Sequence, residues 1–133
     1  MTVPFDPTRR TIIVRAEITG PTGTGTVDLT LDTGSTDTFV DDARLAAVGY
    51  TPAHVTNQFQ VVTGSGIVSV FEVPVMTITA LGQSRTNYPV LAHGFPPAAA
   101  HDGVLGLDFL RGNVLTIDFV KGEIALTPGG STP

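Results

Sequence analysis

Short stretches of alternating apolar and polar residues, separated by glycine and proline, constrain the fold of this chain most. In residues 11–20 every second position is apolar, namely Ile12, Val14, Ala16 and Ile18. Residues 26–31 alternate in the same way, and the turn-forming segment 20–23 joins the two stretches. A period of two residues indicates a strand with one buried face, and two such strands around a turn form a hairpin. The 15 glycines and 10 prolines among 133 residues supply many turns and disfavour long helices.

The rest of the chain continues this pattern and predicts an all-β protein with one or two short helices. Further strands are expected at residues 38–40, 55–62, 67–80, 88–93, 115–119 and 124–126, with turns at 63–66, 81–87 and 120–122. Helices are expected at residues 41–48, capped by Asp41 or Asp42 and ended by Gly49, and at residues 107–111. Pro74 interrupts a β-rich run, so we expect a sheet edge or a bulge there.

Strands at this spacing predict a small barrel or sandwich in a single domain. We assign the domain to residues 11–127, preceded by an N-terminal arm at 1–10 and followed by a flexible tail at 128–133. Residues 94–102 are expected to form an exposed loop. The first ten residues lack the apolar core of a signal peptide, and no apolar run is long enough to cross a bilayer, so we expect a cytoplasmic protein.

Charge and composition exclude several functions. The formal net charge is −5 and the seven basic residues are scattered, which disfavours nucleic acid or an anionic membrane as a partner. The chain has no cysteine, which rules out disulfides and thiolate chemistry. Three histidines, His54, His93 and His101, lie far apart and lack metal-ligand spacing. We therefore expect no metal and no cofactor.

The segment from Leu29 to Val40 carries the most specific chemical signal. It places Asp32 at the end of an apolar strand, directly before Thr33, Gly34 and Ser35. The strand would hold the carboxylate rigidly, and Gly34 would let another backbone or a ligand approach closely. Backbone amides of the loop, and the hydroxyls of Thr33 and Ser35, could hold the carboxylate in place. Read alone, the same residues also fit an ordinary turn in which Asp32 binds its own backbone.

This segment resembles the active-site loop of aspartic proteases, and two further segments extend the resemblance to the retroviral-type (retropepsin-like) members. Thr63, Gly64, Ser65 and Gly66 form a glycine-rich turn between two β-rich runs, where the family has a flap over the substrate. Val104-Leu105-Gly106-Leu107-Asp108 resembles the second family signature, which precedes a short helix. The two signatures are separated by 106 − 32 = 74 residues, a spacing that is ordinary for cellular relatives.

The resemblance covers residues 11–127 and implies a small, closed, β-barrel-like acid protease fold. It implies that Asp32 is catalytic, that Thr33 and Gly34 brace the loop across a dimer interface, and that residues 63–66 form the flap tip. Gly106 and Asp108 would have structural roles. The sequence departs from the viral pattern at Leu107, where those members commonly carry an arginine that helps to lock the dimer.

Aspartic protease chemistry needs two carboxyl groups around one water molecule, and this chain offers one Asp-Thr-Gly. Asp102-Gly103 lacks the hydroxyl residue and Asp108-Phe109 lacks the glycine. We therefore expect a homodimer in which two copies of Asp32 meet at a two-fold axis. The chain ends, residues 3–10 and 124–128, are candidates for strand pairing between the two copies. The expected reaction is endoproteolytic cleavage of an extended peptide, through an activated water and without a covalent intermediate.

Two other interpretations remain open at this stage. The chain could be a catalytically silent module of the same fold that dimerises or binds peptides, because fold alone does not establish activity. It could also be an unrelated small β-barrel that binds a ligand and carries the motif by chance. A Ser-His-Asp triad is disfavoured because Ser35 has no evident histidine partner.

Overall fold

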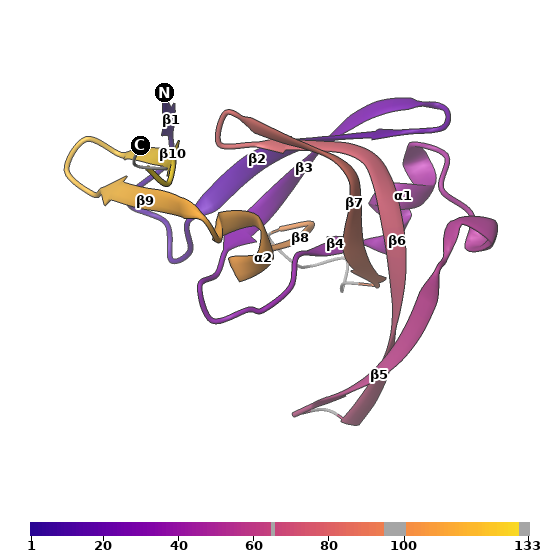
Figure 1. Cartoon of the computed structure of the whole chain (residues 1–133). Coiled ribbons are helices and arrows are strands. Elements are labelled where there is room, and N and C mark those ends of the chain that lie inside the picture. The colour runs from indigo at the N-terminus through magenta and orange to yellow at the C-terminus, as the bar shows by residue number, and fades with distance from the viewer. Residues whose placement is uncertain (65, 95–100, 131–133) are drawn as a thin grey trace.

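The computed structural model describes residues 1–64, 66–94 and 101–130, with Thr63 described by its backbone only. Ten strands and three short helical segments make up this part of the chain (Figure 1). The strands are β1 (Thr2–Pro4), β2 (Ile13–Gly20), β3 (Gly23–Leu31), β4 (Phe39–Asp41), β5 (Asn57–Thr63), β6 (Gly66–Ala80), β7 (Gln83–His93), β8 (Gly103–Leu105), β9 (Asn113–Asp118) and β10 (Glu123–Pro128). The helical segments are α1 (Asp42–Ala47), the 3-10 turn η1 (Pro52–His54) and α2 (Leu107–Leu110).

Six strands close into a barrel, which confirms the predicted all-β, barrel-like fold. The hydrogen-bonded order is β2-β3-β8-β4-β7-β6, and β6 pairs back with β2 to complete the ring. β3 and β8 run parallel from Leu29↔Gly103 to Leu31↔Leu105, so the end of β3 lies beside the end of β8. This parallel pairing brings the Asp32 segment next to the Gly106 segment, although 74 residues separate them.

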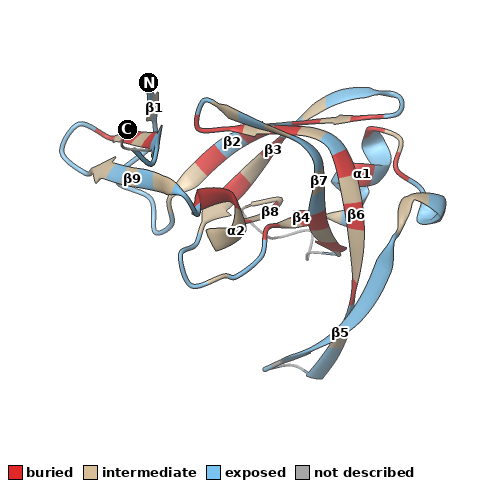
Figure 2. Ribbon diagram, viewed as in Figure 1, coloured by how far each residue is buried: buried red, intermediate tan, exposed pale blue. Residues whose placement is uncertain are grey.

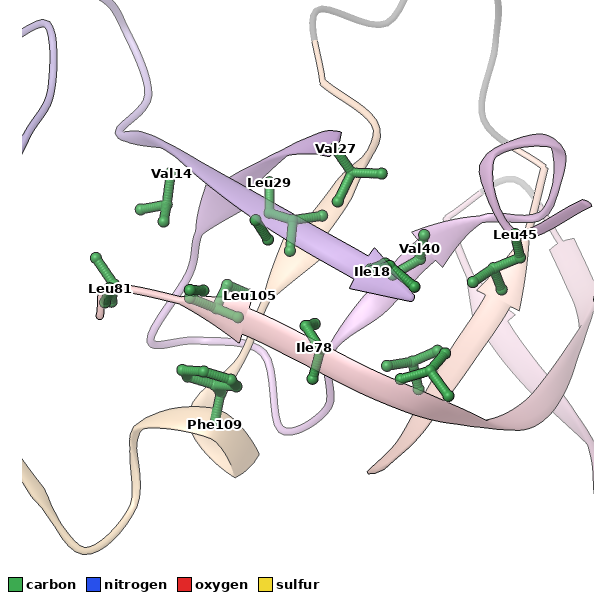
Figure 3. Close-up of a cluster of buried hydrophobic side chains, with 14 of the residues drawn as sticks. Val14, Ile18, Val27, Leu29, Val40, Leu45, Ile78, Leu81, Leu105 and Phe109 are labelled. Atoms are coloured by element: carbon green, nitrogen blue, oxygen red, sulfur yellow. The ribbon is translucent and has the colours of Figure 1, made fainter. Parts of the chain in front are cut away.

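The barrel is filled by the apolar faces of its strands and by one aromatic ring from α2. Along β2 the buried positions alternate with more exposed ones, as the sequence pattern predicts (Figure 2). Leu29, Val40, Ile78, Leu105 and Phe109 are almost completely buried and point into one cluster (Figure 3). Each such side chain contributes about 1.5–3 kcal/mol by leaving water. The core therefore holds β3, β4, β8 and α2 together around the Asp32 segment.

β5 and the first half of β6 form a long hairpin that extends beyond the barrel, and it is largely exposed (Figures 1 and 2). β6 pairs with β5 only as far as Glu72 and with β2 only from Thr77. Pro74 lies between these stretches, where β7 is the only bonded neighbour of β6. The expectation of a local sheet edge at Pro74 is confirmed, because proline has no N–H to offer a second neighbour.

The predicted turn at residues 81–87 is wrong. The turn consists of Leu81 and Gly82 alone, and β7 starts at Gln83, which pairs with Ala80. Both turn residues have positive φ, 53° and 76°, which is typical of the tight two-residue hairpin turn. Leucine rarely adopts that conformation, so the residue pattern held no signal for so short a turn.

Within one chain the two ends pair with each other, and their predicted pairing between two copies stays a prediction. β1 pairs with β10 of the same chain, and β10 also pairs with β9. β1 occupies one edge of β10 along Glu123–Ala125, and β9 occupies the other edge along Glu123–Pro128. The predicted tail also starts later than expected, since Pro128 still pairs with Asn113. Residues 131–133 lie outside the described part, as do residues 95–100 of the predicted loop.

Both predicted helices are present. The Asp41 carboxylate accepts a hydrogen bond from the Ala43 amide at 3.2 Å and caps α1, and Gly49 follows that helix with a φ of 101°. Among the described residues, no helix has the length and apolar character needed to cross a membrane.

Candidate active site

Asp32 lies directly after β3, at an exposed position beside the end of β8. Its amide donates a hydrogen bond to the carbonyl of Leu105 at 3.0 Å, which extends the parallel β3–β8 pairing by one residue. The backbone of Asp32 is thereby anchored to the buried core, while its side chain reaches solvent. This combination of a rigid backbone and an accessible carboxylate suits a reacting group.

The loop that follows Asp32 holds its carboxylate through the backbone. The Gly34 amide donates to Asp32 Oδ1 at 2.8 Å, and the Ser35 amide donates to the Asp32 carbonyl at 3.2 Å. A Cβ atom at Gly34 would lie 3.1 Å from Asp32 Oδ1, so glycine leaves room for this close approach. Thr33 is exposed and lies in the chain between Asp32 and Gly34.

Ser35 differs in detail from the sequence expectation. Its hydroxyl donates to the Asp37 carbonyl at 2.8 Å, so it stabilises the loop itself and not the Asp32 carboxylate. The loop closes like an ordinary turn, with side chains and amides bound to nearby backbone groups. The Asp32 loop differs from an isolated turn because it is also hydrogen-bonded to a second segment of the chain.

That second segment is the N-terminal end of α2. The Leu107 amide donates to the Ser35 carbonyl at 2.8 Å, and the Asp108 amide donates to the Thr36 carbonyl at 3.2 Å. These are N–H groups of the first helical turn, which have no partner inside a helix. A Cβ atom at Gly106 would lie 2.3 Å from the Asp37 carbonyl oxygen, so only glycine permits this contact. The two predicted signature segments therefore form one bonded unit.

Thr38 is a site residue that the sequence interpretation missed. It is fully buried, and its hydroxyl donates to Asp108 Oδ1 at 2.7 Å while accepting from the Gly106 amide at 3.2 Å. The same Asp108 oxygen accepts from the Phe109 amide at 2.9 Å. Asp108 is thereby bonded both to Thr38 and to the backbone of its own helix. The sequence signal that could have identified Thr38 is a threonine four residues after Gly34, next to the apolar residues Phe39 and Val40.

Two further ionisable groups lie close to Asp108. Burial raises the pKa of the Asp37 carboxyl above its usual value, and the nearby charges of Asp108 and Glu72 raise it further. Burial likewise raises the pKa of the Tyr88 hydroxyl, with Asp108 again contributing. The Tyr88 hydroxyl oxygen is buried and has no hydrogen-bond partner among the described residues. Both groups are therefore biased toward their protonated, uncharged forms beside Asp108.

The predicted flap residues lie at the tip of the β5–β6 hairpin. Thr63 pairs with Gly66, whose φ is 122°, and a Cβ atom at Gly64 would meet nothing within 4 Å. Ser65 lies outside the described residues. Next to the tip, Val62 and Ile67 are paired across the strands and are 81% and 68% exposed. An apolar pair this exposed, at the end of a projecting hairpin, is available for a contact with another molecule.

One apolar cavity lies away from the Asp32 loop. It has a volume of about 480 Å³ and lies between α1, η1 and the base of the hairpin, where Leu45, Tyr50, Phe71 and Val73 are among its mainly apolar lining. None of residues 32–35 lines it. No group of three or more His, Cys, Asp or Glu side chains in the described residues is placed to hold a metal ion.

A small closed barrel with an Asp-Thr-Gly loop bonded to a glycine-led helix defines the aspartic protease class of fold. The family model described as aspartyl protease matches residues 14–109, and the chain belongs to this family. Among solved structures, a retropepsin-like aspartic protease from Rickettsia conorii is similar with a TM-score of 0.67. The two chains share 15% sequence identity over 93% of this chain and 97% of that one. No curated protein matches the sequence.

Proposed function

We propose that the chain is an aspartic endopeptidase whose active site forms between two identical copies, each contributing Asp32. The observation that carries the proposal is the exposed Asp32 carboxylate on a loop fixed by Gly34, Leu105 and the start of α2. Membership of the aspartyl protease family supports a peptidase function. The coupling of this loop to the second signature supports Asp32 as the catalytic residue.

The reaction requires two carboxyl groups in different protonation states. One ionised carboxylate takes a proton from a water molecule as general base, while the other, protonated, donates to the carbonyl oxygen of the peptide bond. Two carboxylates about 3 Å apart do not both ionise, so the pair shares one proton, as in aspartic proteases generally. The apparent pKa values then belong to the pair and not to either residue.

Three other carboxylates of the chain are already engaged, which supports a partner subunit as the source of the second acid. Asp41 caps α1, and Asp108 binds Thr38. Asp102 accepts from the Asp28 amide at 2.9 Å and from Arg44 at 3.1 Å. A two-fold axis beside Asp32 supplies an equivalent carboxylate on an equally rigid loop, and such isologous contacts are the commonest kind in oligomers.

In this proposal the β5–β6 hairpin is the flap, with residues 63–66 at its tip. An extended peptide would lie between the flap and the Asp32 loop and would form backbone hydrogen bonds as an added strand. Closure of the flap would exclude bulk solvent from the reacting groups and leave the water molecule that reacts. Phe39, directly after the loop, and the exposed Val62 favour apolar side chains beside the cleaved bond.

The first test compares the wild-type chain with Asp32→Asn on a diverse peptide mixture between acidic and neutral pH. Cleavage that disappears in Asp32→Asn is expected, whereas Asp42→Asn, a change at an exposed acid of α1, should retain it. Sedimentation measurements on the same samples establish the oligomeric state. A dimer without any cleavage would favour the silent peptide-binding module, and a stable monomer would contradict an active site shared between two copies.

Mixing the two proteins tests whether the site is shared. If subunits exchange at random, equal amounts of wild-type and Asp32→Asn chains leave about a quarter of the dimers with two intact acids. Activity per wild-type chain should therefore fall to about half after exchange. An unchanged activity per wild-type chain would contradict a shared active site, even if Asp32→Asn alone were inactive.

A further inference from the structure

Arg85 contacts α2 from a strand that carries no catalytic motif. It lies on β7, and its Nη2 donates to the carbonyl of Phe109 at 3.0 Å. Its guanidinium carbon lies 4.3 Å from the centre of the Phe109 ring. The same ring meets Tyr88 edge-on at 6.1 Å and is fully buried. Arg85 is thus fixed by one charged hydrogen bond and one cation–π contact.

α2 depends on such external contacts. It comprises four residues, far fewer than an isolated helix needs for stability in water. The last carbonyls of a helix lack partners inside it, and Arg85 satisfies that of Phe109. Among the described residues, the ion pairs within 4 Å involve Arg15 and Arg44 and not Arg85. Beyond its own strand, the contacts with α2 are therefore the principal interactions of the Arg85 side chain.

The opposite end of α2 holds the Asp32 loop. The amides of Leu107 and Asp108 donate to the carbonyls of Ser35 and Thr36 at 2.8 and 3.2 Å. A shift of α2 along its axis therefore moves the acceptors on the loop as well. Because α2 is a single turn, its two ends cannot move independently. Contacts made at Phe109 are transmitted to the loop over one helical turn.

We infer that Arg85 is a positioning residue for the proposed peptidase reaction, which it serves by fixing α2 and thereby the loop that carries Asp32. The effect of Arg85 on catalysis rests on the proposed function. Its effect on the position of α2 rests on the contacts described above. Arg85 is assigned no contact with the substrate. It acts at the side of α2 remote from the loop, so it should affect the rate of the chemical step more than substrate affinity.

The kinetic test uses Arg85→Met, which retains an apolar stem but loses the charge and all donors. We expect kcat to fall about ten- to a hundredfold, because small misplacements of reacting groups cost rates of this order, with KM within about twofold. Arg85→Lys keeps a cation over the Phe109 ring and should recover part of kcat. Arg15→Met, at an arginine whose side chain is 74% exposed and pairs with Asp28, is the matched control.

The structural test is independent of activity and uses amide hydrogen exchange at Ser35 and Leu107. Both amides should exchange at least about tenfold faster in Arg85→Met than in Arg15→Met, at conditions where all variants are folded. Arg85→Lys should show a smaller increase, in line with its partial recovery of kcat. Unchanged exchange in folded Arg85→Lys and Arg85→Met, or an unchanged kcat in an active dimer, overturns the inference. If the wild-type protein cleaves no peptide but the amides still exchange faster in the Arg85 variants, the proposed function is refuted and the positioning of the loop by Arg85 is supported.

Discussion

Replacing Gly106 by alanine is the sharpest perturbation that the site offers. The added Cβ atom would lie 2.3 Å from the Asp37 carbonyl oxygen, 2.6 Å from the Asp37 carbonyl carbon and 2.8 Å from the Ser35 carbonyl oxygen. Ordinary contacts begin at 3.4 Å, so the Asp37 oxygen must retreat by 3.4 − 2.3 = 1.1 Å. The φ of Gly106 is −101°, which alanine adopts freely, so the effect is steric and not conformational.

The expected consequences follow from which atoms are displaced. All three are backbone atoms of the loop that begins at Asp32, so no side-chain rotation can relieve the overlap. Overpacking of this kind costs about 1–3 kcal/mol, which lowers the melting temperature by about 4–12 °C in a domain of this size. A displacement of about 1 Å at a reacting group lowers the rate about a hundredfold. We therefore expect a folded but nearly inactive protein.

The assay measures kcat on a cleaved peptide and the melting temperature for Gly106→Ala and for Gly130→Ala. Gly130 is the matched control, because a Cβ atom there meets nothing within 4 Å and the residue has no positive φ. Gly130→Ala should differ from wild type in neither quantity. Wild-type kcat and stability in Gly106→Ala would refute the argument that the second signature and the Asp32 loop are packed as one unit.

Two further predictions concern the groups behind the loop. Thr38→Val leaves the Asp108 carboxylate and the Gly106 amide without their hydroxyl partner. It should therefore lower the free energy of unfolding, measured by urea denaturation, by about 2–4 kcal/mol. A loss below about 0.5 kcal/mol would contradict a stabilising role for these hydrogen bonds of Thr38. Asp37→Asn tests the raised pKa of Asp37, caused by burial first and then by Asp108 and Glu72. Since the folded state disfavours the charged form, the stability linked to this group is complete below pH 3.8 and is lost as pH rises through the raised pKa. Asp37→Asn should therefore raise the melting temperature at pH 7 but not at pH 3, and equal shifts at both pH values would contradict this assignment.

Local sequence patterns predicted much of the fold because the responsible interactions are local. Alternation along residues 11–20 identified β2, and the acidic cap with the following glycine identified α1. The Asp-Thr-Gly-Ser segment and the Gly-Leu-Asp segment were recognisable because each needs particular residues at fixed spacing. The parallel pairing of β3 with β8 brings the two segments together, which neither segment indicates by itself.

Interactions between distant residues were not predictable from these patterns. Thr38 and Asp108 are bonded across 70 residues, and neither residue type alone indicates a buried pair. Asp102 was expected in an exposed loop, yet it accepts the Asp28 amide and pairs with Arg44. Residues 83–87 were interpreted as part of a turn because they are polar, and a two-residue turn with a left-handed leucine has no clear sequence signal.

Residues 83–87, which were expected to form a turn and instead belong to β7, show how the candidate site is assembled. Because β7 begins at Gln83 and not after Asn87, Arg85 lies on a strand of the closed barrel and reaches Phe109. α2 is then held at its end by β7 and at its start by the Asp32 loop, so the loop is braced by a rigid sheet and not by solvent-exposed chain. β7 also pairs along most of its length with β6, which continues into the hairpin. One strand therefore links the two regions that must cooperate in the proposed reaction, and it does so through residues that no catalytic motif contains.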